Sequence, residues 1–267
     1  MDPGPSSCLE RLEEGLEGQG IAFRDVTHIL LTHIHLDHAG ATGSLVKRWP
    51  GIQVLVHERG ARHMAEPSRL LKSAAQLYGS EMDRLWGEFL PVPWQNMVVV
   101  KGGEQVQAGG RRFDVAYTPG HASHHVSYFD PSSGIAFVGD TAGVCIGDFV
   151  LPPTPPPDID IAAWKSSVDR IEHWRPDTLF LTHFGPRPGP VTHLRSLIDN
   201  LERFGGTARR LLQEDASEEE RQRRFIAWVD HELLRHTSPD LAALYAAAAP
   251  LDLLWLGLAR YWRKNGS

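Results

Sequence analysis

The spacing of apolar residues changes repeatedly along the chain, and this change predicts an α/β protein. Short apolar runs bounded by glycine, proline or polar residues occupy 26–33, 52–57 and 178–185 and are typical of strands. Longer segments carry apolar residues at helical spacing, and we expect helices at 39–51, 160–174, 191–203, 218–236 and 238–262. Alternation of strands and helices favours a layered α/β core.

Two regions depart from this alternation. Residues 58–93 have a helical pattern that predicts two or three short helices inserted into the core domain. Their aromatic residues either pack these helices on the core or form an apolar wall for an acyl group: Tyr78, Trp86 and Phe89, with Trp94 just beyond. We therefore expect a catalytic domain at 1–200 that contains this insertion, followed by a helical C-terminal appendage at 201–267.

The appendage ends in a strongly apolar segment, "LDLLWLGLARYW", which includes Leu253, Leu254, Leu256, Leu258 and Trp262. Packing of these residues within the chain is the expectation, and a homodimer contact is the alternative. Pro250 and Asp252 interrupt the apolar run before it reaches the length of about 20 residues that spans a bilayer. The segment therefore does not predict a membrane helix.

Charge and cysteine content narrow the function. The 267 residues carry a net charge of −6, which disfavours nucleic acid as a partner because phosphate binding depends on clustered Lys and Arg. The one dense basic stretch, "RQRRF" at 221–225, follows "EDASEEE" and predicts a charged helix start. Two cysteines cannot form a thiolate metal cluster, and free thiols favour a cytoplasmic location.

The stretch "THIHLDH" places three histidines and an aspartate within six positions, directly after an apolar run. His33 and His35 are two residues apart, so they share a face only if the backbone is extended. Asp37 and His38 are adjacent and diverge, so they can serve a second centre. Four such groups crowded together without a cation would be costly, and the spacing indicates two metal ions, one for each pair.

The ligands of one segment cannot complete the coordination of two metal ions, and three later segments supply further candidates. "YTPGHASHH" places His121 after a strand and a Pro-Gly turn, "AFVGDTAG" places Asp140 after an apolar strand, and "LFLTHFGP" does the same for His183. Each segment has an apolar strand, one ligand-type residue and small residues that allow close backbone approach. Zinc needs about four ligands, so these residues are expected to complete the coordination.

The series "THIHLDH … TPGH … GD … THFG" resembles the metallo-β-lactamase-fold hydrolase superfamily over roughly residues 2–186. The resemblance implies a four-layer αββα sandwich with the site at one edge of its two sheets. It implies that His33, His35 and His121 bind one metal, that Asp37, His38 and His183 bind the other, and that Asp140 bridges both. Asp2 and Gly4 match a D-x-G turn that a β-hairpin precedes in relatives, and this hairpin is missing here.

The resemblance also implies a reaction, in which a metal-bridging hydroxide cleaves a carboxylic ester, thioester or lactone of a small molecule. Glyoxalase-II-like and lactonase-like members are the nearest analogies. Asp37 and Asp140 are the expected catalytic carboxylates, and two divalent ions, zinc with iron or manganese as alternatives, are the expected cofactors. The other hypotheses are a mononuclear iron enzyme that oxidises a persulfide, and a β-lactam or phosphodiester hydrolase.

Several further residues near these motifs are interpreted as structural. His125 is expected to support the site without binding metal, and His124 to be an exposed neighbour. His57 is expected to be a hydrogen-bonded histidine at a strand end, and Cys145 a buried thiol.

Overall fold

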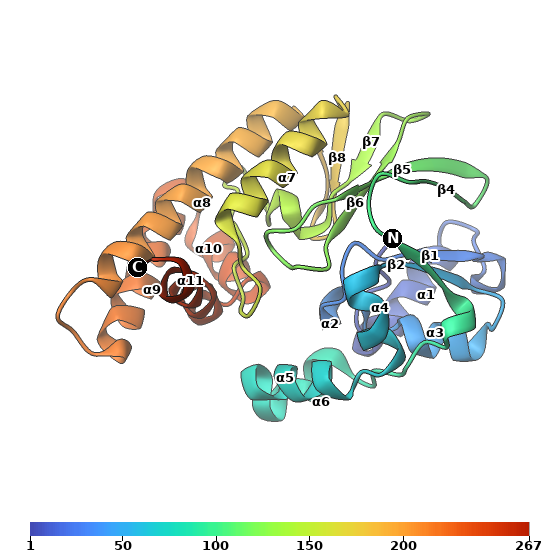
Figure 1. Cartoon of the computed structure of the whole chain (residues 1–267), viewed down its shortest axis with the longest axis horizontal. Helices are drawn as coiled ribbons and strands as arrows, with labels where there is room; N and C mark the ends of the chain where they lie inside the picture. Colours follow the sequence, from blue (N-terminus) through green and yellow to red (C-terminus); the bar gives the residue numbers. More distant parts are fainter. Residues whose placement is uncertain (267) are drawn as a thin grey trace. The chain divides into compact units, whose positions relative to one another are not determined.

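The computed structural model describes residues 1–266, which cluster into two compact units. Unit 1 comprises residues 1–117 and 124–133, and unit 2 comprises residues 118–123 and 134–266. The short segment 118–123 therefore belongs to the same unit as the C-terminal half of the chain. The two units are described in turn, and Figure 1 gives the labels of their elements.

Unit 1 contains a parallel sheet in the order β1 (His28–Leu30), β2 (Gln53–His57) and β3 (Met97–Val100). Ile29 of β1 lies opposite Val54, and Val56 lies opposite Val99 of β3. All residues from Val54 to His57 are buried, so both faces of the central strand are covered, as is usual for parallel sheets. The predicted strands at 26–33 and 52–57 are thus confirmed.

Unit 1 also contains helices, which Figure 1 labels. They are α1 (Leu9–Glu17), α2 (Leu36–Ala39), α3 (Thr42–Arg48), α4 (Glu58–Ala65), α5 (Ser68–Tyr78) and α6 (Met82–Trp86), with 3₁₀ turns η1 (Ser6–Cys8), η2 (Phe23–Asp25), η3 (Gly79–Glu81) and η4 (Trp94–Asn96). The helices expected within 58–93 are α4, α5 and α6. Phe89 is buried in the apolar core of unit 1, and Tyr78 and Trp86 pack against that core, whereas Trp94 is 56% exposed. The packing interpretation therefore holds for three of the four aromatic residues.

A second, antiparallel set of strands in unit 1 consists of β4 (Gln105–Ala108), β5 (Arg111–Tyr117) and β6 (Val126–Asp130). The turn between β4 and β5 is formed by Gly109 and Gly110, whose φ angles are 56° and 77°. Two positive φ angles in a two-residue hairpin turn match the right-handed twist of the flanking strands, and glycine adopts them without strain.

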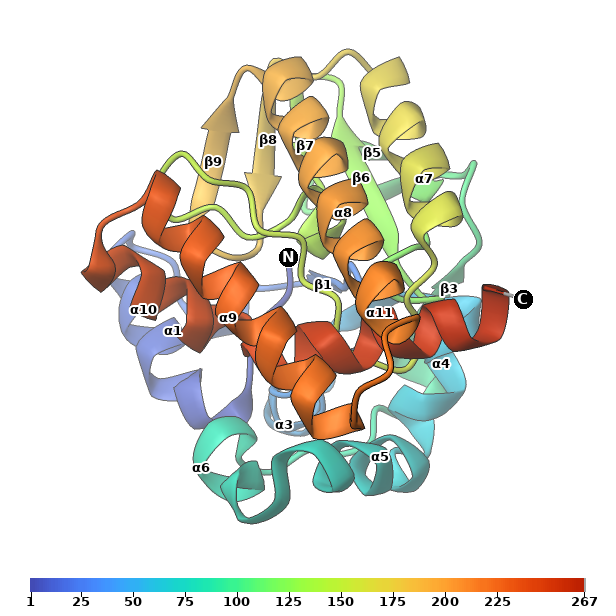
Figure 2. The same ribbon diagram turned by 90° about the vertical axis from the view of Figure 1, so that its left-hand side faces the viewer.

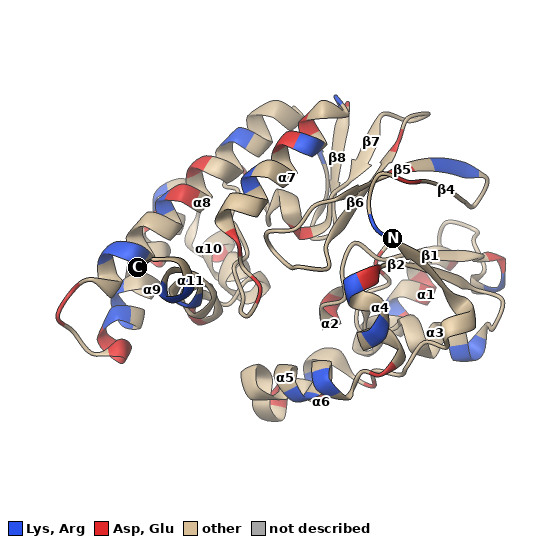
Figure 3. Ribbon diagram, viewed as in Figure 1, with Lys and Arg blue, Asp and Glu red and all other residues tan. Residues whose placement is uncertain are grey.

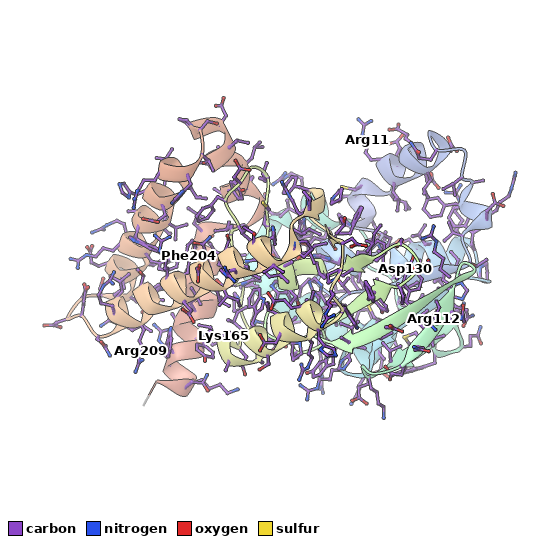
Figure 4. The ribbon with its side chains drawn as sticks, turned by 90° about the horizontal axis from the view of Figure 1, so that it is seen from above. Arg11, Arg112, Asp130, Lys165, Phe204 and Arg209 are labelled. Atoms are coloured by element: carbon purple, nitrogen blue, oxygen red, sulfur yellow. The ribbon has the colours of Figure 1, made fainter. Side chains whose placement is uncertain are left out.

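Asp130 ends β6 and is the main buried carboxylate of this hairpin region (Figure 4). Hydrogen bonds from Ser132 and Arg111 lower the pKa of Asp130 well below its ordinary value. Because its pKa is lowered on folding, Asp130 stabilises the fold at pH values above the ordinary pKa of a carboxyl group, and this contribution is lost as the pH falls.

We expect Asp130→Asn to lower the free energy of unfolding by about 1–3 kcal/mol at pH 7, because Ser132 and Arg111 lose the charged acceptor of their hydrogen bonds. The difference from the unchanged protein should shrink as the pH falls below about 5, because the unfolded chain takes up the proton first, and it should vanish only at the still lower pH where folded Asp130 is protonated. Urea titrations at pH 7 and pH 3 measure both values. The exposed Asp83→Asn is the control, and an Asp130→Asn effect of equal size at both pH values would contradict the assignment.

Unit 2 contains β7 (Ile135–Phe137), β8 (Thr178–Leu181) and β9 (Gly185–Pro188), with α7 (Ile161–His173) in the connection between β7 and β8. β7 and β8 are parallel, and β8 and β9 are antiparallel. The sequence interpretation missed β9, whose residues are Gly-Pro-Arg-Pro. Proline cannot donate to a neighbouring strand and is therefore confined mostly to sheet edges, which is where β9 lies in its sheet.

The C-terminal helices of unit 2 are α8 (Pro190–Leu212), α9 (Glu218–His236), α10 (Pro239–Ala248) and α11 (Leu251–Asn265). α8 contacts α7, α9 and α11 (Figure 2). The single helical segment expected at 238–262 is in fact two helices. Ala249 has φ −138° and ψ 89°, because a residue before proline is disfavoured in helical geometry and Pro250 cannot donate to the preceding turn.

The apolar C-terminal residues pack within unit 2, as expected. Leu253, Leu254, Trp255 and Leu258 are all buried, and Phe204 of α8 (Figure 4) is fully buried against α9. Among the described residues, no single helix is long and apolar enough to cross a membrane, although α10 and α11 meet the length and composition test as a pair bent by 54°.

Basic and acidic side chains are mixed along α8 and α9 (Figure 3). In the basic stretch at the start of α9, Arg223 pairs with Glu220, and Arg224 pairs with both Glu214 and Glu220. This pairing agrees with the interpretation of 221–225 as a charged helix start.

Candidate metal centre

The four ligand-type residues of unit 1 lie on the segment that follows β1. His35 has φ −60° and ψ 155°, which is extended backbone, and it is the residue before α2. His33 and His35 therefore precede the helix, whereas Asp37 and His38 lie in it. The change from extended to helical backbone explains why the sequence spacing separates these residues into two pairs.

Each pair is close enough to share a cation. His33 Nε2 lies 3.0 Å from His35 Nδ1, and His38 Nε2 lies 3.4 Å from the Asp37 carboxylate. His33 and His38 are buried, while about a third of the Asp37 side chain is exposed. These four residues belong to groups of histidine and aspartate that could hold a metal ion.

Asp2 fixes this segment and was not among the expected site residues. One carboxylate oxygen accepts a hydrogen bond from the Thr32 backbone N–H at 2.7 Å. The other accepts bonds from the Thr32 hydroxyl at 2.7 Å and from His38 Nδ1 at 3.0 Å. Burial alone would raise the pKa of Asp2, but the bonds from His38 and Thr32 outweigh burial and lower it. The D-x-G turn was the sequence signal for this residue, and His38 is thereby oriented with Nε2 toward Asp37.

In unit 2 the structure brings together His121, Asp140 and His183. One oxygen of Asp140 lies 3.5 Å from His121 Nε2, and the other lies 3.5 Å from His183 Nε2. His121 and Asp140 are buried, and the His183 side chain is 22% exposed. A carboxylate whose two oxygens face two different imidazoles has the arrangement of a ligand that bridges two cations. All three residues belong to groups that could hold a metal ion.

The Pro-Gly turn before His121 is required by close packing. Gly120 has φ +139°, and a Cβ atom there would lie 2.3 Å from the Cβ of Trp164 on α7. The indole of Trp164 donates to the Thr141 carbonyl at 2.7 Å, next to Asp140. Glycine at 120 therefore lets α7 approach both His121 and the 3₁₀ turn η5 (Gly139–Ala142) that carries Asp140.

The remaining histidines follow the expectations with one exception. His57 is buried at the end of β2, accepts a hydrogen bond from the Arg59 N–H at 3.3 Å, and stacks on Tyr117. His125 is buried 5.0 Å from the His33 ring, which fits a supporting role. The expectation for His124 is wrong. It is buried rather than exposed, because its Nδ1 accepts a hydrogen bond from the Ile34 N–H and its ring lies beside His33 and His35.

The buried thiol expected at position 145 is present. Cys145 is 3% exposed, and its Sγ lies 3.2 Å from the Gly147 carbonyl, to which it donates. Burial raises the pKa of Cys145, so the thiol stays protonated and is a poor nucleophile.

Unit 2 also has a pocket of about 400 Å³ that the sequence interpretation did not identify. It is formed by residues 148–150, one face of α8 and the end of α9, and is lined by Asp148, Phe149, Val150, Ser196, Asp199, Asn200, Arg203 and His236. Arg203 is paired with the buried Glu232, and Asp148 and Asp199 are the acidic residues of the lining.

The donor set fits divalent metal ions. It consists of imidazole nitrogens and carboxylate oxygens with no thiolate, which is a set that zinc, iron, manganese and cobalt accept. His121 donates its Nδ1–H to the Pro153 carbonyl at 2.9 Å, so Nε2 carries the lone pair that a metal requires.

Comparison with known proteins agrees with this description. The model of the metallo-beta-lactamase superfamily matches residues 1–183. A metallo-beta-lactamase fold-containing protein, ST1585 of Sulfurisphaera tokodaii, is 29% identical over 196 residues, which cover 70% of this chain and 74% of that protein. A hydroxyacylglutathione hydrolase of Legionella pneumophila (strain Corby) is 34% identical over 141 residues, which cover 53% of this chain and 41% of the relative.

A solved structure extends the similarity over the C-terminal helices. The metallo-beta-lactamase family protein TTHA1429 from Thermus thermophilus superposes with a TM-score of 0.73 at 22% identity, covering 99% of this chain and 84% of the other. The chain therefore belongs to the metallo-β-lactamase superfamily and has the α/β fold of that superfamily. The chain spans about two fifths of the length of the hydroxyacylglutathione hydrolase it matches.

Proposed function

We propose that the protein is a binuclear metal-dependent hydrolase that cleaves a carboxylic ester, thioester or lactone of a small molecule. The observation that carries this proposal is the Asp140 carboxylate, each of whose oxygens faces a different histidine in unit 2. In the proposed centre, His33 and His35 join His121 on one side of Asp140, and Asp37 and His38 join His183 on the other.

The residues have separate roles in the proposed reaction. Two bound divalent ions would supply a hydroxide at neutral pH and would polarise the carbonyl of the substrate. Asp37 is partly exposed, so its carboxylate can accept a hydrogen bond from the attacking water and orient it. His183 is the more exposed of the two histidines beside Asp140, which makes its side the more accessible to substrate. Asp2, through His38, and Pro153, through His121, keep the imidazoles in the required tautomers.

The substrate class rests on the relatives and on charge. Hydroxyacylglutathione, named for the 34% identical relative, is an acylated thiol, and its hydrolysis cleaves a thioester. The net charge of −6 disfavours a polyanionic substrate such as a nucleic acid. An acyl compound of low molecular weight is therefore the preferred substrate, and a phosphodiester is the less favoured one.

The test is a panel of esters, thioesters, lactones and one β-lactam, assayed with the purified protein after loading with zinc, manganese or iron. We expect about two metal ions per chain by elemental analysis and turnover of at least one acyl substrate that a chelator abolishes. One iron per chain with oxygen uptake in the presence of a persulfide would instead establish the mononuclear oxidoreductase. Metal binding without turnover of any panel member would contradict the proposed substrate class.

A further inference from the structure

The segment 144–154 connects the two halves of the proposed centre in unit 2. It begins just after η5, which carries Asp140, and Val144 and Leu151 exchange two backbone hydrogen bonds of 2.9 Å that close it into a loop. Its penultimate residue, Pro153, offers the carbonyl that accepts the Nδ1–H of His121. A displacement of this segment would therefore remove the partner that holds the His121 ring.

Tyr245 of α10 holds the middle of the segment. Its hydroxyl accepts hydrogen bonds from the N–H groups of Ile146 at 2.9 Å and Gly147 at 3.1 Å, and it donates to the Phe149 carbonyl. The side chain is fully buried, and its one phenol pairs with three backbone groups of the segment. Tyr245 lies about a hundred residues beyond the segment that it fixes.

The backbone of α11 holds the end of the segment. The Thr154 hydroxyl donates to the Leu254 carbonyl at 3.2 Å. A Cβ atom at Gly257 would lie 1.9 Å from the Thr154 carbonyl oxygen and 2.9 Å from the Pro155 carbonyl carbon. Both contacts are to backbone, which cannot rotate away, so only glycine allows α11 to approach the peptide next to Pro153.

We propose that α10 and α11 are a structural part of the metal centre, and that Tyr245 and Gly257 are positioning residues for His121. Through the segment 144–154 they set the position of the Pro153 carbonyl. That carbonyl selects the His121 tautomer that has hydrogen on Nδ1 and leaves Nε2 available for a metal. This inference rests on the proposed function as far as it concerns a bound metal, whereas the tautomer is a property of the metal-free protein.

The first experiment compares Gly257→Ala with Gly206→Ala. Both glycines lie in helices, but a Cβ atom at Gly206 would meet nothing within 4 Å. Alanine is favoured over glycine in helices, so a loss in Gly257→Ala comes from its contact with Thr154. We expect the affinity for Co²⁺, measured by chelator competition and the visible absorption of the ion, to fall about 10- to 100-fold in Gly257→Ala only. Equal affinity in both variants would overturn the inference.

The second experiment does not depend on metal and covers the case in which Gly257→Ala fails to fold. Nitrogen-15 NMR of the metal-free protein should show His121 with hydrogen on Nδ1, and Tyr245→Phe should convert it to a mixture of tautomers. The control is Tyr261→Phe, since the Tyr261 hydroxyl faces the backbone of Ala162 on α7. Hydrogen on Nε2 of His121 in the unchanged protein, or no change in Tyr245→Phe, would overturn the inference. The expected tautomers without Co²⁺ binding would uphold the positioning and count against the proposed function.

Discussion

Replacing Asp140 by asparagine is expected to lower kcat/KM by about 1000-fold and the metal content from two ions to one per chain. The amide keeps the size of the side chain and one acceptor oxygen, but it cannot offer charged oxygens to both His121 and His183. Metal ions stabilise several kcal/mol of developing charge in the transition state, and about 4 kcal/mol corresponds to a factor of about 1000. Steady-state kinetics on the best substrate of the panel and elemental analysis measure the two effects.

Asp169→Asn is the matched control for this variant, because Asp169 is an exposed carboxylate on α7 of the same unit. The control should keep both metal ions and full activity. Circular dichroism and thermal unfolding establish that Asp140→Asn is folded, so that lost activity is not lost structure. Turnover close to that of the unchanged protein, with two ions still bound, would reject the bridging role of Asp140.

The candidate metal ligands could be selected from the sequence because their signals are local. His33, His35, Asp37 and His38 lie within six positions, and their spacing alone separates an extended pair from an adjacent pair. The backbone changes from extended to helical between these pairs. His121, Asp140 and His183 each follow a short apolar strand, so the type of residue and the local pattern were sufficient to select them.

The residues that orient the ligands could not be selected in this way. Tyr245 and Gly257 lie about a hundred residues from the segment that they contact, and neither belongs to a motif. The residues next to His124 in the sequence do not indicate that it is buried. Its ring accepts a hydrogen bond from Ile34, which is far away in the sequence. The helix break at Pro250 was missed although the proline itself is visible in the sequence, and the strand β9 was hidden by its prolines.

The D-x-G turn shows how such a supporting residue can still be recognised. Its glycine, Gly4, has φ +81° and donates its N–H to the His38 carbonyl at 3.0 Å, so the turn lies directly against the metal-ligand segment. Asp2 itself has φ 33°, an uncommon angle for a residue with a side chain. An aspartate held in this conformation, buried and bonded to Thr32 and His38, is a residue on which both stability and metal binding should depend.

Asp2→Ala is therefore expected to lower the free energy of unfolding by about 3–5 kcal/mol, because it removes one partner from a buried charged network. The Thr32 N–H and hydroxyl would lose their acceptor, and His38 would lose the group that orients its ring. Metal affinity should fall about 10- to 100-fold even in protein that remains folded, since a residue that orients a ligand histidine typically has an effect of this size. Urea titration and chelator competition measure the two quantities separately.

Two further variants separate orientation from general destabilisation. Asp2→Asn keeps an acceptor for the Thr32 N–H but replaces the charged oxygen that faces His38. Compared with Asp2→Ala, it should therefore retain a larger fraction of the loss in metal affinity than of the loss in unfolding free energy. Asp25→Ala removes an exposed carboxylate of unit 1 whose nearest cation is 4.0 Å away, and we expect a change below about 0.5 kcal/mol. Metal affinity that follows stability in proportion across all three variants would show that Asp2 supports the fold without orienting His38.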